Sequence, residues 1–209
     1  MFRSFSETVF LCYKACVGGG VDIGTAQDIA VSTTLIGTYQ NEIFGQLPDL
    51  ISAPQNKQHI TNTFSKTANF ESVLAVHNGL FLADCLQSNL LEEIKIKEID
   101  NILLFVGICL HLVTEFSWDI LIDDKFVVRI SNKNLSADLA FLASGGAKNI
   151  TIQKSDETNK SLIQLKPTST IFLDAENWHA LNRLAAHTYV DETMHSRISG
   201  AGAGLTDND

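Results

Sequence analysis

The sequence predicts an α+β fold, and three observations support this prediction. Apolar residues recur with helical spacing over about residues 1–90. Short β-favouring stretches then follow one another over about 93–173 with no helical pattern between most of them, which favours an antiparallel sheet. A last helical pattern and a glycine-rich tail occupy 174–209. We expect these three parts to form a single α+β domain over residues 1–209.

The first helix is expected to begin at Ser4, because Ser4 and Glu7 have the spacing of a capping box. Apolar residues then recur about one helical turn apart, at Val9, Phe10, Tyr13, Cys16 and Val17. The Gly18–Gly20 run predicts its end.

A second helix is expected from about Asp22 to Gln40, and the two helices would form a hairpin around the glycine turn. One narrow face of this second helix consists of small residues, which allow close helix packing: Ala26, Ala30, Thr33 and Gly37.

Residues 45–67 are polar and contain two prolines, so we predict a loop with short irregular pieces. A third helix is predicted from about Phe70 to Gln87. The apolar run 102–113 is too short to span a bilayer and is expected to be a buried strand or a core helix.

Strands dominate the predictions from residue 93 onward. Residues 118–122 and 125–130 are typical of a β-hairpin, with Asp123 and Asp124 as the turn. Four shorter strand candidates follow, at 139–142, 150–153, 162–165 and 170–173. Asp174 is a good N-cap for a final helix that is expected to end near His187.

Composition excludes several classes of function. The net charge is −9 and the 15 basic residues are scattered, so we expect neither nucleic acid nor a membrane surface as a partner. Glu7 and Lys14 flank and interrupt the only stretch that faintly resembles an export signal. The four cysteines form no Cys-x-x-Cys pair. We therefore expect a cytoplasmic protein with reduced thiols.

The C-terminal tail is the most informative candidate site. Its glycines alternate with alanines at Gly200, Gly202 and Gly204, and the chain ends in Asp-Asn-Asp. Such a composition cannot pack into a core, and we expect it to fray unless it binds something. The spacing is not that of a dinucleotide fingerprint, and no phosphate-binding loop motif is present. Backbone amides between small residues could instead approach a ligand closely.

Residues near this tail supply the candidate chemistry. Arg197 could bind a carboxylate or phosphate with Ser196 beside it, or could pair with the terminal aspartates. Tyr189 and Asp191 are the candidates for proton transfer. Gly19 and Gly20, before a helix N-terminus, are a second ligand-binding candidate, although Asp22 is expected to cap that helix instead.

Other reactive residues have simpler explanations. His187, Asp191 and His195 would share a face if helical, but β-favouring residues intervene and we expect no metal site there. Three oxygens in the terminal Asp-Asn-Asp are a weak case for a hard cation. His77, His111, Cys12 and Cys16 are expected to pack in or near the core. No cofactor is indicated.

The two ends of the sequence resemble a family of uncharacterised bacterial proteins, catalogued as a domain of unknown function. The N-terminal match is Ala15-Cys-Val-Gly-Gly-Gly20 followed by Gly24-Thr-Ala26. The C-terminal match comprises Thr188-Tyr-Val190, Ser196-Arg197 and the stretch from Gly200 to Asp209. The family often has an arginine at the position of His187 and a proline at that of Asp191. The resemblance implies a functional tail and brings no reaction with it.

Two functional hypotheses follow. The first is an enzyme or enzyme-like protein that acts on a small anionic or polar metabolite, at a site formed by the tail and the N-terminal glycine hairpin. The alternative is an accessory or interaction subunit whose acidic tail docks into a partner protein. A third option is a tail that only stabilises its own sheet. The sequence does not indicate the oligomeric state.

Overall fold

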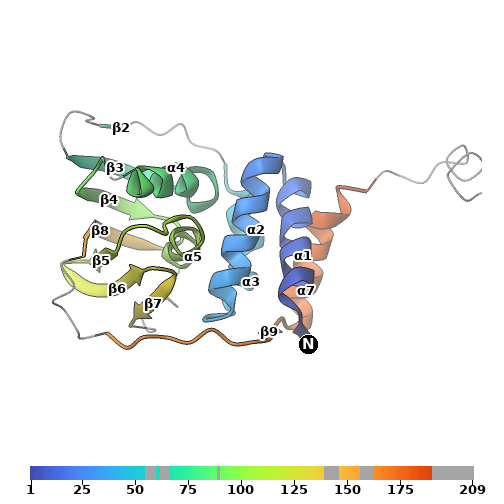
Figure 1. Ribbon diagram of the computed structural model, residues 1–209. Coiled ribbons are helices and arrows are strands. Elements are labelled where there is room, and N and C mark those ends of the chain that lie inside the picture. The colour runs from blue at the N-terminus through green and yellow to red at the C-terminus, as the bar shows by residue number, and fades with distance from the viewer. Residues whose placement is uncertain (55–59, 62–65, 89, 139–145, 156–161, 190–209) are drawn as a thin grey trace, which may run out of the picture.

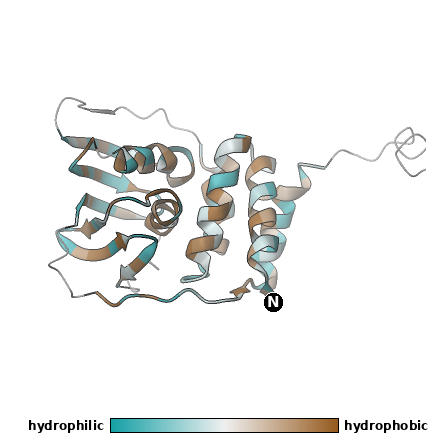
Figure 2. Ribbon diagram, in the orientation of Figure 1, coloured by the Kyte–Doolittle hydropathy of each residue, from teal (hydrophilic) through white to brown (hydrophobic). Residues whose placement is uncertain are grey.

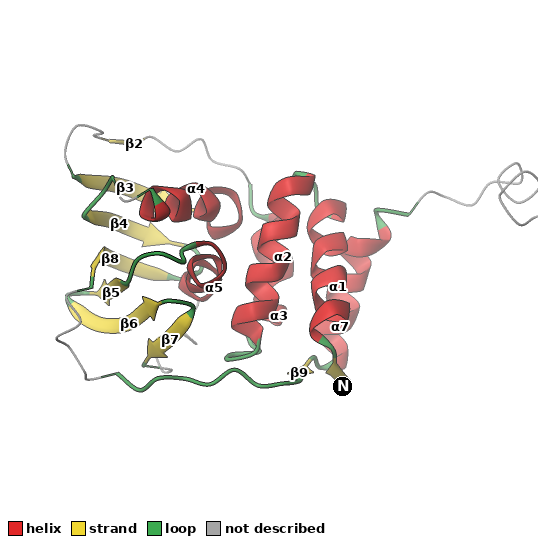
Figure 3. Cartoon of the chain, viewed as in Figure 1, coloured by secondary structure: helices red, strands yellow, loops and turns green. Residues whose placement is uncertain are grey.

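A computed structural model describes residues 1–54, 60–61, 66–88, 90–138, 146–155 and 162–189 (Figure 1). Within these residues, six helices and a mixed sheet of short strands confirm the predicted α+β fold class (Figure 3). The helices are α1 (Phe5–Gly18), α2 (Ile23–Gly37), α3 (Ile43–Ser52), α4 (Ala75–Gln87), α5 (Ile102–Leu112) and α7 (Ala175–Ala186). The strands are β1 (Phe2–Arg3), β2 (Ile60–Thr61), β3 (Thr67–Val73), β4 (Glu93–Ile99), β5 (Trp118–Ile122), β6 (Lys125–Ser131), β7 (Asn134–Ala137), β8 (Ala147–Lys154) and β9 (Ile171–Phe172).

The main sheet has seven strands in the order β2-β3-β4-β8-β5-β6-β7. All of its neighbours are antiparallel except β3 and β4, which run parallel and are joined through α4. The sequence predicted an antiparallel sheet and missed this parallel pair. The short β1 and β9 pair with each other in a separate ribbon.

The elements stack in successive layers (Figure 1). Helices α4 and α5 pack on the sheet, α2 and α3 lie beyond them, and α1 and α7 are outermost. Alternation along the strands matches this arrangement: Phe70, Ile96 and Ile152 are buried, whereas Lys95 and Gln153, the sequence neighbours of Ile96 and Ile152, are exposed. The sheet therefore has one apolar face against the helices and one polar face toward solvent.

Helix α5 occupies the centre of the core. Nine of its eleven residues are buried, from Ile102 through Leu110, and it is largely apolar in Figure 2. A helix that is apolar on all sides must be surrounded by protein. The run 102–113 was expected as a strand or a core helix, and it is the helix. None of the described helices is both long and apolar enough to cross a bilayer.

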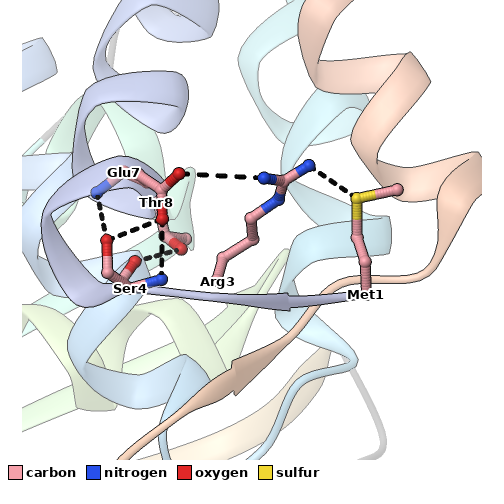
Figure 4. Close-up of polar contacts among 5 residues, drawn as sticks. All are labelled: Met1, Arg3, Ser4, Glu7 and Thr8. Carbon is pink, nitrogen blue, oxygen red and sulfur yellow. Dashed lines mark hydrogen bonds and ion pairs between the residues drawn. The ribbon is translucent and has the colours of Figure 1, made fainter.

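Helix α1 begins as the sequence predicts (Figure 4). The hydroxyl of Ser4 accepts a 3.2 Å hydrogen bond from the Glu7 amide, and the Ser4 amide donates to Glu7 Oε2 at 3.0 Å. These reciprocal bonds satisfy two backbone donors that a helix start leaves unpaired.

The predicted small-residue face of α2 is confirmed, because all four residues are buried. This face allows α2 to pack closely against neighbouring helices. A methyl group at Gly37 would lie 2.3 Å from Phe44 Cζ, and one at Gly107 of α5 would lie 2.6 Å from the backbone oxygen of Ser32.

Two sequence predictions are wrong. Helix α3 covers residues 43–52, eight of which were assigned to a loop because the stretch is polar and contains two prolines. Burial of Phe44, Leu47 and Ile51 outweighs the hydrogen bond that Pro48 cannot donate. Residues 70–73 were assigned to a helix but continue strand β3, where parallel pairing with β4 decides the conformation.

The remaining predictions have mixed outcomes. The hairpin of β5 and β6 is confirmed, and Asp123 and Asp124 adopt positive φ angles of 47° and 61° as a tight hairpin turn requires. Strands β8 and β9 confirm the candidates at 150–153 and 170–173. The 162–165 candidate makes only an isolated bridge at Gln164, the one at 139–142 lies outside the described residues, and β7 was missed.

Candidate functional site

The structure describes three of the residues predicted from the sequence to form a site, namely Gly19, Gly20 and Tyr189. Six others lie outside the described residues: Asp191, Ser196, Arg197, Gly200, Gly202 and Gly204. A site formed by the tail therefore stays a prediction.

Tyr189 is exposed and lies beside α1. The Lys14 ammonium donates a 3.2 Å hydrogen bond to the Tyr189 hydroxyl, and it lies 4.5 Å from the ring centroids of both Tyr189 and Phe10. Just before it, His187 Nδ1 is 3.2 Å from the Gly18 carbonyl oxygen. The chain thus reaches residue 189 next to the glycine turn.

The glycines of this turn have structural reasons to be glycine. A Cβ at Gly18 would lie 1.9 Å from the Leu184 carbonyl oxygen, and one at Gly19 would lie 2.1 Å from Ile51 Cγ2. Gly20 adopts a φ of +89°, which side chains disfavour. Asp22 stands at the N-cap of α2 but makes no side-chain capping bond, contrary to the expectation that it caps the helix.

The structure brings together a second set of polar residues that the sequence analysis missed. Strands β3 and β4 are parallel, so their carboxyl ends share one edge, and in open parallel α/β sheets ligands bind at such an edge. Helices α4 and α5 both begin at this edge. Asp100 and Asn101 lie between β4 and α5, and His77 lies in the first turn of α4.

Hydrogen bonds tie this edge to the helical layer. Asp100 Oδ1 accepts a 2.7 Å bond from the Ala75 amide at the start of α4. Asn101 caps α5 by accepting from the Leu104 amide at 2.8 Å, and its side-chain amide donates to Gln46 Oε1 of α3 at 2.6 Å. The two residues after β4 therefore orient the first turns of α4 and α5 and also contact α3.

Asp100 is the electrostatically unusual member of the set. Burial raises the pKa of its carboxyl above the ordinary value of 3.8 and outweighs the Ala75, Asn101 and Asp100 amides and His77, all of which favour the charged form. Its Oδ2 is buried and accepts no hydrogen bond of normal geometry from the described residues. His77 Nε2 is likewise buried without such a partner. Buried polar atoms without partners are uncommon and often mark functional positions.

A pocket of about 450 Å³ opens at the same edge. Charged residues of both signs line it: Glu98, Asp100 and Lys148. Gly146 also contributes, where a methyl group would lie 3.2 Å from the backbone oxygens of Ile99 and Asp100. The volume suits a small molecule.

The polar face of the sheet contains a further pocket, of about 500 Å³. Its side chains largely bind one another: Lys97 pairs with Glu71 at 2.9 Å and Asn149 donates to Asp123 at 2.7 Å. Outside this pocket, Arg129 of β6 donates two hydrogen bonds of 2.7 and 2.8 Å to Asp119 of the neighbouring strand β5. These contacts fix strand register.

The described residues contain no centre for metal or thiol chemistry. Within the described ranges, no group of three or more His, Cys, Asp or Glu residues could hold a metal ion. Cys12 and Cys16 are buried, as expected, and burial raises the pKa of Cys12 to about 12. His111 Nε2 lies 3.4 Å from Asp28 Oδ1.

The Asp100 site escaped sequence analysis because the 70–87 segment was assigned to one helix. The strand-to-helix boundary at Leu74, and hence the parallel pair that brings His77 close to Asp100, was not foreseen. A detectable signal was present, since Asp100 and Asn101 directly follow the alternating residues 93–99. Comparison with known proteins adds nothing to this assignment, because no family model, no curated protein and no solved structure matches the chain.

Proposed function

We propose that the chain is an enzyme or enzyme-like protein that acts on a small polar or anionic metabolite, with Asp100 as the group that exchanges a proton. One observation carries the proposal: a half-buried carboxyl has one oxygen fixed by the Ala75 amide at 2.7 Å while its other oxygen has no partner of normal geometry among the described residues.

The chemistry follows from this environment. Burial raises the pKa of the Asp100 carboxyl and so favours its protonated form. A protonated carboxyl can donate to a substrate oxygen or nitrogen, and the carboxylate left behind can take a proton back. The Ala75 amide keeps the group oriented during both steps. His77 favours the charged form of Asp100 and would thereby set how readily the proton leaves.

The pocket indicates the class of substrate. Its volume of about 450 Å³ fits a small metabolite, and Lys148 offers a positive charge to an anionic group. The protein's net charge of −9 repels anions at long range, so this local cation would be the feature that retains one.

The predicted site from Tyr189 to Gly204 is a second location for the same function. Lys14 supports it, because its ammonium lies against the Tyr189 hydroxyl and would stabilise negative charge there. Deleting residues 190–209 distinguishes the two candidate sites experimentally, because the deletion removes the tail and leaves Asp100 and its contacts at the sheet edge in place.

The test is a thermal-shift screen of the full chain against a panel of small carboxylic and phosphorylated metabolites. We expect at least one compound to raise the melting temperature of wild type and of the 190–209 deletion but not of Asp100→Asn. Asp84→Asn, an exposed carboxylate on α4, is the matched control and should retain the shift. The proposal fails if the panel has no hit, or if every hit shifts Asp100→Asn as much as wild type.

A further inference from the structure

The Asp100 pocket has two opposite charges on neighbouring strands at its solvent side. Glu98 of β4 and Lys148 of β8 are directly opposite each other in the antiparallel ladder, and both line the pocket. Both residues are exposed, whereas Asp100 is half-buried. A ligand that enters from solvent therefore passes these two charges on its way to the Asp100 carboxyl.

The two charges are not neutralised by a direct ion pair. Among the described residues, neither Glu98 nor Lys148 has an ion-pair partner within 4.0 Å. By contrast, Lys97 of β4 holds Glu71 of β3 at 2.9 Å. The hydrogen bond and charge of Glu71 raise the pKa of the Lys97 ammonium, with a smaller contribution from Glu98. Both charges of the pocket thus remain available to a ligand.

We propose that the substrate of this site is a zwitterion of the amino-acid type, with its carboxylate bound by Lys148 and its ammonium group bound by Glu98. The inference rests on the proposed function, because it names the substrate class of the Asp100 site. Residues directly opposite in an antiparallel pair have Cβ atoms about 4.5–5.5 Å apart. From that spacing, the long side chains of Glu98 and Lys148 can both reach a molecule that carries its two charges on one carbon atom.

The same pair of charges selects against other ligands, because specificity is a difference of affinities. A simple carboxylate or phosphate is attracted by Lys148 but repelled by Glu98 beside it, and the net charge of −9 adds to the repulsion at long range. A simple amine is attracted by Glu98 and repelled by Lys148. A zwitterion is attracted by both side chains, so the pocket favours it over either single ion.

The rest of the pocket leaves space for the uncharged part of such a molecule. Ile99 and Ala147 form the next pair along the ladder and line the pocket together with Gly146. The small residues at 146 and 147 keep the path from the two charges to Asp100 open. The substrate would therefore place its charged groups against Glu98 and Lys148 and its remainder toward Asp100, within a volume of about 450 Å³.

The test measures, by calorimetry on the full-length protein, the binding of the common amino acids, of the matched carboxylic acids without the amino group and of the matched amines without the carboxyl group. We expect at least one amino acid to bind, and its matched acid and amine to bind at least about 10-fold more weakly. Glu98→Gln should reduce the affinity for the amino acid to about that for the acid. Lys148→Gln should reduce it to about that for the amine.

The matched controls are Glu71→Gln and Lys97→Gln. They remove the same charges from the neighbouring ion pair, neither residue lines this pocket, and both variants should bind the amino acid as wild type does. Because Glu98 and Lys148 are exposed, Glu98→Gln and Lys148→Gln should keep the melting temperature of the unliganded protein.

Two results would overturn the inference and leave the proposed function standing. One is a carboxylic or phosphorylated compound that binds wild type as tightly as any amino acid and no longer binds Asp100→Asn. The other is an amino acid that Asp100→Asn no longer binds but that Glu98→Gln binds as tightly as wild type does. Binding of no amino acid also overturns the inference, and if no carboxylic or phosphorylated compound binds either, the proposed function fails as well.

Discussion

The Oδ1 atom of Asp100 accepts a 2.7 Å hydrogen bond from the backbone amide of Ala75, so the residue after β4 fixes the first turn of α4. The contact connects the end of β4 to the start of α4, the helix that follows the parallel strand β3. It also leaves the second carboxyl oxygen buried without a partner of normal geometry among the described residues.

The first prediction concerns pH and stability. Because the folded-state pKa of Asp100 is raised, the folded protein binds this proton more tightly than the unfolded chain. Asp100 should therefore favour folding most at low pH, and its contribution should fall as pH rises from about 3.8 through the raised folded-state pKa. Urea unfolding of wild type and Asp100→Asn from pH 3.5 upward should show the variant gaining relative stability with pH. A constant difference would contradict the assignment.

Asn101→Ala should destabilise the protein by ~2 kcal/mol, because it removes the α5 cap and leaves Gln46 without its donor. Asn101→Ser keeps an uncharged capping oxygen, loses the amide donor to Gln46 and should cost less. Chemical denaturation measures both, and equal losses would show that the cap contributes nothing.

Two glycines on neighbouring helices should respond in opposite directions. Gly18→Ala places a methyl group 1.9 Å from the Leu184 carbonyl oxygen and should destabilise the folded protein by ~1–3 kcal/mol. Gly24→Ala meets nothing within 4 Å, and in the first turn of α2 it should be neutral or stabilise by up to ~1 kcal/mol. Melting temperatures distinguish them, and a harmless Gly18→Ala would argue against the α1–α7 contact.

The thiols should differ sharply in reactivity. Cys12, Cys16 and Cys109 are buried and burial raises the pKa of each, whereas Cys85 is only partly buried. Burial and the Asp84 charge still raise the pKa of the Cys85 thiol, so its reaction should be slow but first. Native protein treated with a thiol reagent should modify Cys85 first, and denatured protein all four. Early modification of Cys12 would contradict the packing of α1.

The helices with clear local signals could be predicted from sequence. Ser4 and Asp174 have side chains that cap their helices by local hydrogen bonds, and both helix starts are confirmed. The β5–β6 hairpin likewise depends on a two-residue turn between alternating strands. In each case the residues that determine the element lie within a few positions of it.

The elements that were missed depend on distant contacts. Pro48 opposes a helix locally, yet α3 forms because Phe44 and Leu47 are buried against other helices. Strand β3 pairs with β4, although α4 separates the two strands in the sequence. The composition of residues 67–73 does not reveal this contact. Asp100 was missed for the same reason, since its importance arises from the neighbouring α4 start and not from any local motif.

The most direct measurement of the central claim is a ¹³C NMR titration of the Asp100 carboxyl, assigned with Asp100→Asn, in the full-length chain. The account predicts a midpoint above the ordinary value of 3.8, and a further rise in His77→Gln because His77 favours the charged form. A midpoint at or below 3.8 would contradict the claim that this carboxyl is poised to exchange a proton.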